Sequence, residues 1–276
     1  MTRTAEATVT RVVSRDGTEI AWWTSGKGPP LVLVHGAVAD HRRWRPLLPH
    51  LERFATVHAL DRRGRGASAD GPGYDLTREF EDVAAVVDAV AEASGSAVGL
   101  YGHSFGGLCA FGGATLTANV GRLALYEGWP PVDGAASGLP AGVGERLDAL
   151  LAEGDHEAVV ETMFREVVGM SEAELAAVKA QPSWPARVAA APTLVRELRA
   201  IPVTPLDPRQ AARIAVPTLL LTGSDSRDPF AADAGAVAAA LPDARVVVLE
   251  GQQHVGDILA PEVVAGHLAT FLRDHP

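Results

Sequence analysis

The stretch Ala97-Val-Gly-Leu-Tyr-Gly-His-Ser-Phe-Gly-Gly-Leu-Cys-Ala110 decides the fold expected for this chain. Residues 97–101 are small or apolar and favour a buried parallel strand. The pentapeptide Gly102-His-Ser-Phe-Gly106 follows, and its two glycines let the strand and the next segment approach closely around Ser104. The small residues from Phe105 onward are typical of a helix packed on a sheet. This strand, turn and helix make Ser104 a candidate nucleophile.

Apolar strand patterns and helix patterns alternate on both sides of this stretch. Between residues 128 and 213 the strand pattern stops and helix signals replace it, including a capping box at Ser171-Glu-Ala-Glu174. We therefore expect an α/β core made of residues 1–127 and 214–276, with a helical cap of residues 128–213 inserted in it. The strands expected are 8–14 and 18–24 as an antiparallel edge, then 31–34, 56–60, 97–101, 122–126, 218–222 and 245–249. Helices are expected over 44–54, 77–91 and 231–241, and from Pro261.

Charge and composition exclude some classes of partner. The chain has 276 residues, 24 Lys plus Arg against 34 Asp plus Glu, and a net charge of −10, which argues against nucleic acid as a partner. Residues 93–121 carry no charge and are long enough to span a bilayer, but glycines interrupt them. A buried strand packed on a buried helix explains this stretch, so we expect no membrane segment and a small-molecule substrate.

The single cysteine, Cys109, cannot form an internal disulfide, and residues 1–6 show no apolar signal sequence. Both features favour a cytoplasmic protein. Cys109 falls within the helix after Ser104, where a small buried residue suffices, and is not expected to be a nucleophile. The sequence leaves a monomer and a homodimer equally open.

A serine hydroxyl needs a base, and His254 is the best placed of nine histidines. It follows the last predicted strand, so it belongs to the same carboxyl edge of the sheet as Ser104. His35 and His103 are more typical of structural or pocket-lining positions. The loop His35-Gly-Ala-Val38 follows the strand 31–34, which makes the backbone amide of Ala37 a candidate oxyanion donor. Three arginines in Asp61-Arg-Arg-Gly-Arg65 are expected to form a structural loop, paired with Asp61 or with neighbouring backbone.

The chain resembles the α/β-hydrolase superfamily over essentially its whole length. The resemblance lies in the order of four features: His35-Gly36, Asp61-Arg-Arg-Gly-Arg-Gly-Ala-Ser68, Gly102-His-Ser-Phe-Gly106 and His254. The resemblance implies an eight-stranded, mostly parallel sheet with helices on both faces and a lid between strands six and seven. We expect His254 to deprotonate Ser104, and the backbone amides of Ala37 and Phe105 to stabilise the oxyanion that forms. No metal or organic cofactor is needed. Superfamily members that attack alkyl halides or epoxides use an aspartate nucleophile, so Ser104 argues against those reactions.

The acidic partner of His254 is the point where the chain departs from the superfamily pattern. The usual position, three residues after the glycine that closes the seventh strand, is occupied by Ser226. Asp225 lies one residue early and Asp228 two residues late. Some superfamily members carry the acid after strand six, where this chain has Glu127. Glu127 and Asp225 both remain candidates, and Asp228 is less favoured.

Large side chains of the cap predict an apolar acyl or aryl pocket, and the function expected is that of a serine hydrolase. Its substrate would be a small or medium apolar acyl ester, thioester or lactone. The same site would serve a biosynthetic cyclase or acyltransferase or a carbon–carbon bond hydrolase, and the fold also serves non-catalytic ligand receptors. The candidate pocket residues are His35, Val38, His103, Trp129, Met163 and Trp184.

Overall fold

Strand β5 (Val98–His103) lies inside an eight-stranded sheet and leads through Ser104 into helix α3 (Phe105–Ala114). The computed structural model describes residues 8–132, 140–201, 205–226 and 228–273, without the side chains of residues 8 and 228–232. The strand order is β1-β2-β4-β3-β5-β6-β7-β8. Strand β2 pairs antiparallel with β1 and β4, and all other pairs are parallel. The other strands are β1 (Thr8–Val13), β2 (Glu19–Gly26), β3 (Pro30–Val34), β4 (Thr56–Asp61), β6 (Val120–Tyr126), β7 (Thr218–Gly223) and β8 (Ala244–Leu249).

Both faces of the sheet are covered, because alternate residues of each buried strand point in opposite directions. In β3, Val32 and Val34 join one core with helices α2 (Leu76–Ser94), α3 and α10 (Asp228–Ala240). Leu31 and Leu33 join the other core with α1 (Leu48–Leu51) and α12 (Pro261–Arg273). The expected eight-stranded, mostly parallel sheet with helices on both faces is therefore confirmed. The helix predicted over 44–54 is shorter, since a 3-10 turn, η1 (His41–Trp44), precedes α1.

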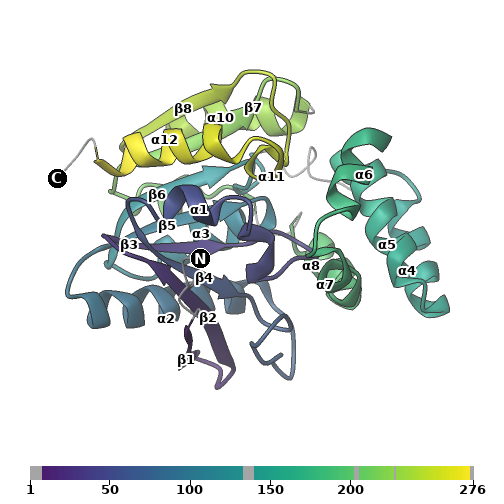
Figure 1. The fold of residues 1–276 in the computed structure, drawn as a ribbon, viewed down its shortest axis with the longest axis horizontal. Coiled ribbons are helices and arrows are strands. Elements are labelled where there is room, and N and C mark those ends of the chain that lie inside the picture. Colours follow the sequence, from purple (N-terminus) through teal and green to yellow (C-terminus); the bar gives the residue numbers. More distant parts are fainter. Residues whose placement is uncertain (1–7, 133–139, 202–204, 227, 274–276) are drawn as a thin grey trace, which may run out of the picture.

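A helical insertion separates β6 from β7 and lies to one side of the sheet (Figure 1). The capping box predicted at Ser171 and Glu174 is present at the start of α6. No helix among the described residues is long and apolar enough to cross a membrane. The insertion comprises α4 (Val143–Glu153), α5 (His156–Thr162), the π-helical turn η2 (Met163–Val168), α6 (Glu172–Lys179), α7 (Trp184–Ala189), α8 (Ala191–Ala200) and α9 (Pro208–Ala211).

Buried ion pairs fasten this insertion to the core. Glu197 of α8 accepts hydrogen bonds from Arg62 and Arg65, which belong to the loop after β4. Arg62 also binds Glu79 of α2, with an Nη2–Oε1 distance of 2.6 Å. The arginine loop is structural, as expected, but these two arginines pair with distant carboxylates on helices rather than with Asp61. Such partners are difficult to predict from the sequence, because they lie far apart along the chain.

Candidate active site

The backbone at Ser104 has φ 55° and ψ −132°, a strained conformation that turns the chain sharply between β5 and α3. Close packing around the turn requires its glycines. A Cβ on Gly106 would lie 2.3 Å from the carbonyl oxygens of Val34 and His35, and one on Gly102 would lie 2.6 Å from the Gly106 oxygen. These contacts bring β3, β5 and α3 together beneath Ser104.

Ser104 shares its positive φ with Val38 (42°) and Glu127 (45°), the other non-glycine residues with this feature in the described chain. Each follows the carboxyl end of a neighbouring central strand: β3, β5 or β6. Such strain persists where the surrounding structure fixes the backbone, and it clusters at functional sites. A Cβ on Gly128 would lie 1.9 Å from the backbone carbonyl oxygen of Ser104, so the segment after β6 packs directly on the serine turn.

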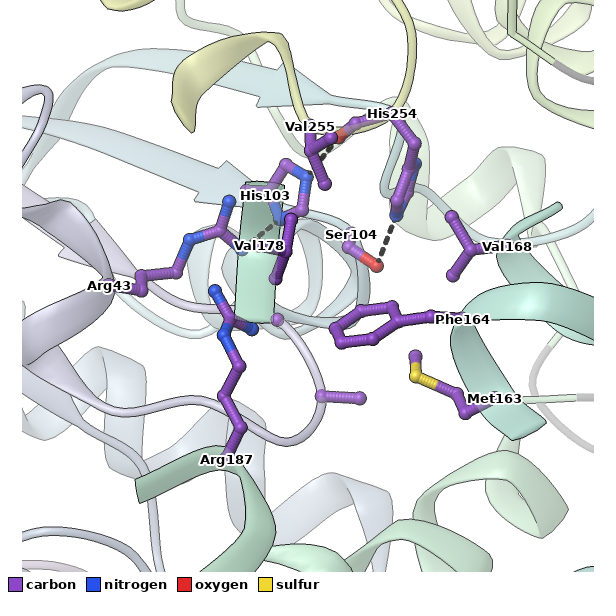
Figure 2. A pocket seen from close by; sticks show the side chains of 12 residues that line it. Arg43, His103, Ser104, Met163, Phe164, Val168, Val178, Arg187, His254 and Val255 are labelled. Carbon is purple, nitrogen blue, oxygen red and sulfur yellow. Dashed lines mark hydrogen bonds between the residues drawn. The ribbon is translucent and has the colours of Figure 1, made fainter. Parts of the chain in front are cut away.

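His254 lies between Ser104 and Glu127. Its Nε2 is 2.9 Å from Ser104 Oγ, and its Nδ1 is 2.7 Å from Glu127 Oε2 (Figure 2 shows the first contact). The remaining Glu127 oxygen accepts from the Gly223 amide at 2.7 Å and from Thr222 Oγ1 at 3.1 Å. These two hydrogen bonds hold the carboxylate of Glu127 in place beside the imidazole of His254.

Burial of Glu127 raises the pKa of its carboxyl, but the hydrogen bond and charge of His254 and the Gly223 amide outweigh burial, so the pKa lies below its usual 4.5. Glu127 is thus a carboxylate at neutral pH, and it accepts a hydrogen bond from the protonated Nδ1 of His254. The other ring nitrogen of His254, Nε2, is then free to accept the Ser104 hydroxyl proton.

Asp225, the alternative acid, lies on an exposed turn after β7 and is hydrogen-bonded to Ser224 Oγ at 2.8 Å. Asp225 is exposed on this turn, whereas Glu127, at the end of β6, contacts His254 Nδ1. Asp228 starts α10, and its side chain lies outside the described residues.

His103 is a neutral support for the backbone of His254. Arginine only donates, so the 2.6 Å contact from Arg43 Nη1 makes His103 Nδ1 an acceptor. The other nitrogen, Nε2, then donates to the His254 carbonyl oxygen at 2.6 Å (Figure 2). Burial, with the nearby Arg43 charge, holds the pKa of His103 well below its usual value. Arg43 is itself balanced by Asp257 of α11 (Gly256–Leu259), at 2.7 Å from Nη2 to Oδ1.

The two predicted oxyanion donors lie beside Ser104. A Cβ on Gly36 would be only 3.0 Å from Ser104 Cβ, so the loop that carries Ala37 packs against the serine turn. Ala37 and Ser104 line the same pocket. Phe105 is the first residue of α3, where a backbone N–H has no intrahelical acceptor. Both residues therefore lie next to the turn that carries Ser104.

The pocket above Ser104 has an apolar wall and a cationic wall (Figure 2). The insertion supplies Met163, Phe164, Val168, Val178 and Arg187, and the core supplies the rest. Of the six predicted pocket residues, His103 and Met163 line it. The complete lining is Gly36, Ala37, Arg43, His103, Ser104, Met163, Phe164, Val168, Val178, Arg187, His254 and Val255.

The other four predicted pocket residues are not among the side chains that line this pocket. His35 lies below the loop, where its Nε2 accepts from the Arg62 amide at 3.1 Å. Val38 is fully buried, and Trp129 belongs to the same large core. Trp184 faces its own insertion and donates to Glu157 Oε1 at 3.1 Å. Size and apolarity alone did not separate pocket residues from core residues.

Arg43 and Arg187 were missed by the sequence interpretation. Arg43 lies among other arginines in His41-Arg-Arg-Trp-Arg45, Arg187 lies in a cap helix, and neither belongs to a recognised motif; only the folded chain brings both to one pocket. Phe164, Val168 and Val178 follow ordinary helical spacing and carry no separate signal.

Asp40, His41 and Asp61 form the one group of potential metal-ligand side chains found in the described part of the chain, with atoms within 4.8 Å of one another. Hydrogen bonds within the protein already use these atoms. Asp61 accepts from His41 Nδ1 at 2.8 Å and from Trp23 Nε1 at 3.0 Å, and Asp40 pairs with Arg42. The group therefore works as an internal network that braces the loop after β4.

Comparison with known proteins gives consistent matches over nearly the full chain. A model described as the alpha/beta hydrolase family matches residues 31–267. The crystal structure of an alpha/beta hydrolase from Sphaerobacter thermophilus is 36% identical, with a TM-score of 0.80 over 95% of this chain and 100% of that one. The (E)-2-((N-methylformamido)methylene)succinate hydrolase of Acinetobacter baylyi is 27% identical over 92% of this chain and 94% of its own. A non-heme haloperoxidase of Rhodococcus erythropolis is also 27% identical, over 95% and 98%.

Proposed function

Because this chain belongs to the alpha/beta hydrolase family and is a hydrolase, we propose that it cleaves acyl esters, thioesters or lactones through a serine acyl-enzyme. Ser104 is the nucleophile, His254 the base and Glu127 the acid. The observation that supports the proposal is the continuous contact from Glu127 Oε2 to His254 Nδ1 (2.7 Å) and from His254 Nε2 to Ser104 Oγ (2.9 Å).

In the first half of the reaction, His254 Nε2 takes the hydroxyl proton as Ser104 Oγ attacks the acyl carbon. The amides of Ala37 and Phe105 hold the oxyanion that develops, and a donor of this kind contributes about 10²–10³ to kcat. Glu127 stabilises the imidazolium. The imidazolium then gives its proton to the leaving oxygen or sulfur, and the acyl group stays on Ser104.

The second half repeats these roles with water. His254 takes a proton from water, the hydroxide attacks the acyl-enzyme, and the same amides hold the second oxyanion. Proton transfer to Ser104 Oγ releases the carboxylic acid. We propose that the insertion, residues 128–213, acts as the cap that limits water and shapes this step, since five of the pocket-lining side chains come from it.

The decisive experiment is Ser104→Ala, assayed with a panel of short acyl p-nitrophenyl esters. Turnover is expected to fall to a residual of about 10³–10⁴ over the water reaction, since oxyanion stabilisation and binding remain. A fluorophosphonate is expected to label the wild-type protein once and Ser104→Ala not at all. Ser96→Ala, in an exposed turn, is the matched control and keeps both properties. Near-normal kcat in folded Ser104→Ala would eliminate the mechanism.

A further inference from the structure

Arg187 is a buried cation that forms no ion pair with any carboxylate in the part of the chain that the structure describes. It stands on α7 of the insertion, and 2% of the residue is exposed. One of its nitrogens, Nη1, donates to the Val38 carbonyl at a long 3.4 Å. Its Nε and Nη2 have no hydrogen-bond partner, and no other arginine described has two such buried nitrogens. Native proteins pair nearly all buried donors, so this side chain needs an explanation.

Neighbouring charges do not supply the missing partner. Asp257 and Asp40 are the carboxylates that act electrostatically on Arg187, and each already has a partner: Arg43 Nη2 binds Asp257, and Arg42 binds Asp40. Burial, together with the positive charge of Arg43, lowers the pKa of Arg187 to about 9, so the group is still a cation at neutral pH. A buried, unpaired charge destabilises a folded protein. Binding of an anion would remove that cost.

The free atoms of Arg187 form a defined recognition edge. Nε and Nη2 lie on the same edge of the planar guanidinium, and this edge takes a carboxylate in two parallel hydrogen bonds. Arg187 lines the pocket that Ser104 also lines, and in the view of Figure 2 the Phe164 ring lies beside the guanidinium and below Ser104. The Phe164 ring centre lies 5.6 Å from the Arg187 guanidinium carbon, close enough for a cation–π contact.

We propose that Arg187 is a subsite for a free carboxylate on the substrate, so that the enzyme hydrolyses the ester, thioester or lactone of a compound bearing a second carboxyl group. The inference rests on the proposed function of Ser104. The apolar wall formed by Met163, Phe164 and Val168 contacts the carbon chain between the two carboxyl groups. Arg43 is already balanced by Asp257 and adds only to the positive potential.

The first test compares substrates that differ in charge. Wild-type kcat/KM is expected to be at least about tenfold higher for monomethyl succinate or monomethyl glutarate than for methyl butyrate. Arg187→Met keeps much of the side-chain volume and is expected to lose at least about 30-fold on the monomethyl esters, from the hydrogen bonds to a charged group. Methyl butyrate has no carboxylate to lose, so the ratio of kcat/KM for the monomethyl esters to kcat/KM for methyl butyrate is expected to fall at least about tenfold in this variant. Arg187→Lys keeps the charge without the two parallel bonds, and an intermediate loss is expected.

Arg199→Met is the matched control for these measurements. Arg199 lies on α8 of the same insertion, but it is exposed and pairs with Asp148 at 2.6 Å. This variant is expected to behave as the wild type on both kinds of ester. Equal losses on charged and neutral esters in Arg187→Met, or a wild-type preference for methyl butyrate, would overturn the inference.

The second test does not depend on turnover. Succinate is expected to raise the Tm of the wild type and of Arg199→Met, but not of Arg187→Met. Unliganded Arg187→Met is expected to be at least as stable as the wild type, since an unpaired buried charge is removed. A purely structural Arg187 predicts the reverse: a lower Tm in the variant and no succinate effect in the wild type.

The two proposals fail in different ways. If no ester is turned over and fluorophosphonate leaves Ser104 unlabelled, the serine mechanism fails, whereas an Arg187-dependent succinate shift still supports the carboxylate subsite. If Ser104 hydrolyses neutral esters as well as monomethyl esters and succinate has no effect, the subsite alone is wrong. Both wild-type measurements hold even if Arg187→Met does not fold.

Discussion

Glu127 combines two properties that seldom meet in one residue: a left-handed backbone with φ 45° and a buried carboxylate with three hydrogen-bond donors around it. A left-handed backbone is costly for a residue other than glycine. Tight packing of Gly128 on Ser104 and the backbone bond from the Glu127 amide to Leu221 hold it in place. The carboxylate is therefore aimed at His254 before any substrate arrives.

Replacing Glu127 by Gln removes the charge while keeping the shape of the side chain. We expect kcat to fall at least several hundredfold, because the equivalent change in a serine protease triad costs about 10⁴. Asp225→Asn, on the exposed turn, is the comparison and should change kcat less than about tenfold. Steady-state kinetics on one p-nitrophenyl ester measures both. The opposite ranking would transfer the role to Asp225.

The lowered pKa of Glu127 also makes stability depend on pH. Its folded pKa lies below the usual 4.5, so the carboxylate contributes stability above the unfolded pKa and loses that contribution as pH falls through the folded value. The difference in free energy of unfolding between the wild type and Glu127→Gln is therefore expected to shrink as pH falls from about 5 to 3. Urea titrations at several pH values measure it. A difference that widens toward pH 3 would contradict the sign.

At the scale of elements, the joint between β5 and α3 depends on glycines that admit the neighbouring backbone. Gly106→Ala would place a Cβ 2.3 Å from two carbonyl oxygens at the end of β3. We expect a loss of about 2 kcal/mol or more in free energy of unfolding, with a fall in kcat, because Ser104 and Ala37 are forced apart. Guanidinium unfolding and ester kinetics measure the two effects.

Gly235→Ala is the control for this change, because it is the same substitution in a helix, α10, where the new Cβ meets nothing within 4 Å. It should leave kcat unchanged and stabilise the protein by about 0.4–1 kcal/mol, since alanine restricts the unfolded chain. Equal stability losses at both glycines would show that the backbone contacts at Gly106 relax freely.

At the scale of the whole molecule, buried charges join the insertion to the sheet. Glu197 of α8 is bound by Arg62 and Arg65 of the core, and Arg62 also stacks over the Phe105 ring at 4.5 Å. The same contact that docks α8 therefore reaches the first residue after the nucleophile. Arg187 on the neighbouring α7 depends on this docking for its place in the pocket.

Among the described residues, Glu197→Gln leaves Arg65 without a carboxylate partner and leaves Arg62 with Glu79 alone. Breaking a buried ion pair on one side costs about 3–5 kcal/mol, so we expect a loss of that size in chemical denaturation and faster hydrogen exchange in α7 and α8. Asp148→Asn breaks an exposed pair with Arg199 and should cost less than about 1 kcal/mol. If the two variants are equally stable, the buried network does not hold the insertion.

The local features can be predicted from short stretches of the sequence: the strand, turn and helix around Ser104, the alternation of strands and helices, and the helical insertion after β6. Each of these features depends on residues close together in the sequence: apolar runs, helix-capping residues and glycines at the turn. The position of His254 at the same sheet edge follows as well, because parallel strands bring their carboxyl ends together.

The choice of the carboxylate that contacts His254, and of the side chains that face the pocket, depends on how distant elements pack together. Glu127 and His254 are separated by 127 positions, and their contact depends on the pairing of β6 with β7 and on the loop after β8. Trp129 and Met163 are both large and belong to the same buried core, yet of the two it is Met163 that also lines the pocket. Side-chain type sets what a residue can do, and the packing of distant elements sets what it touches.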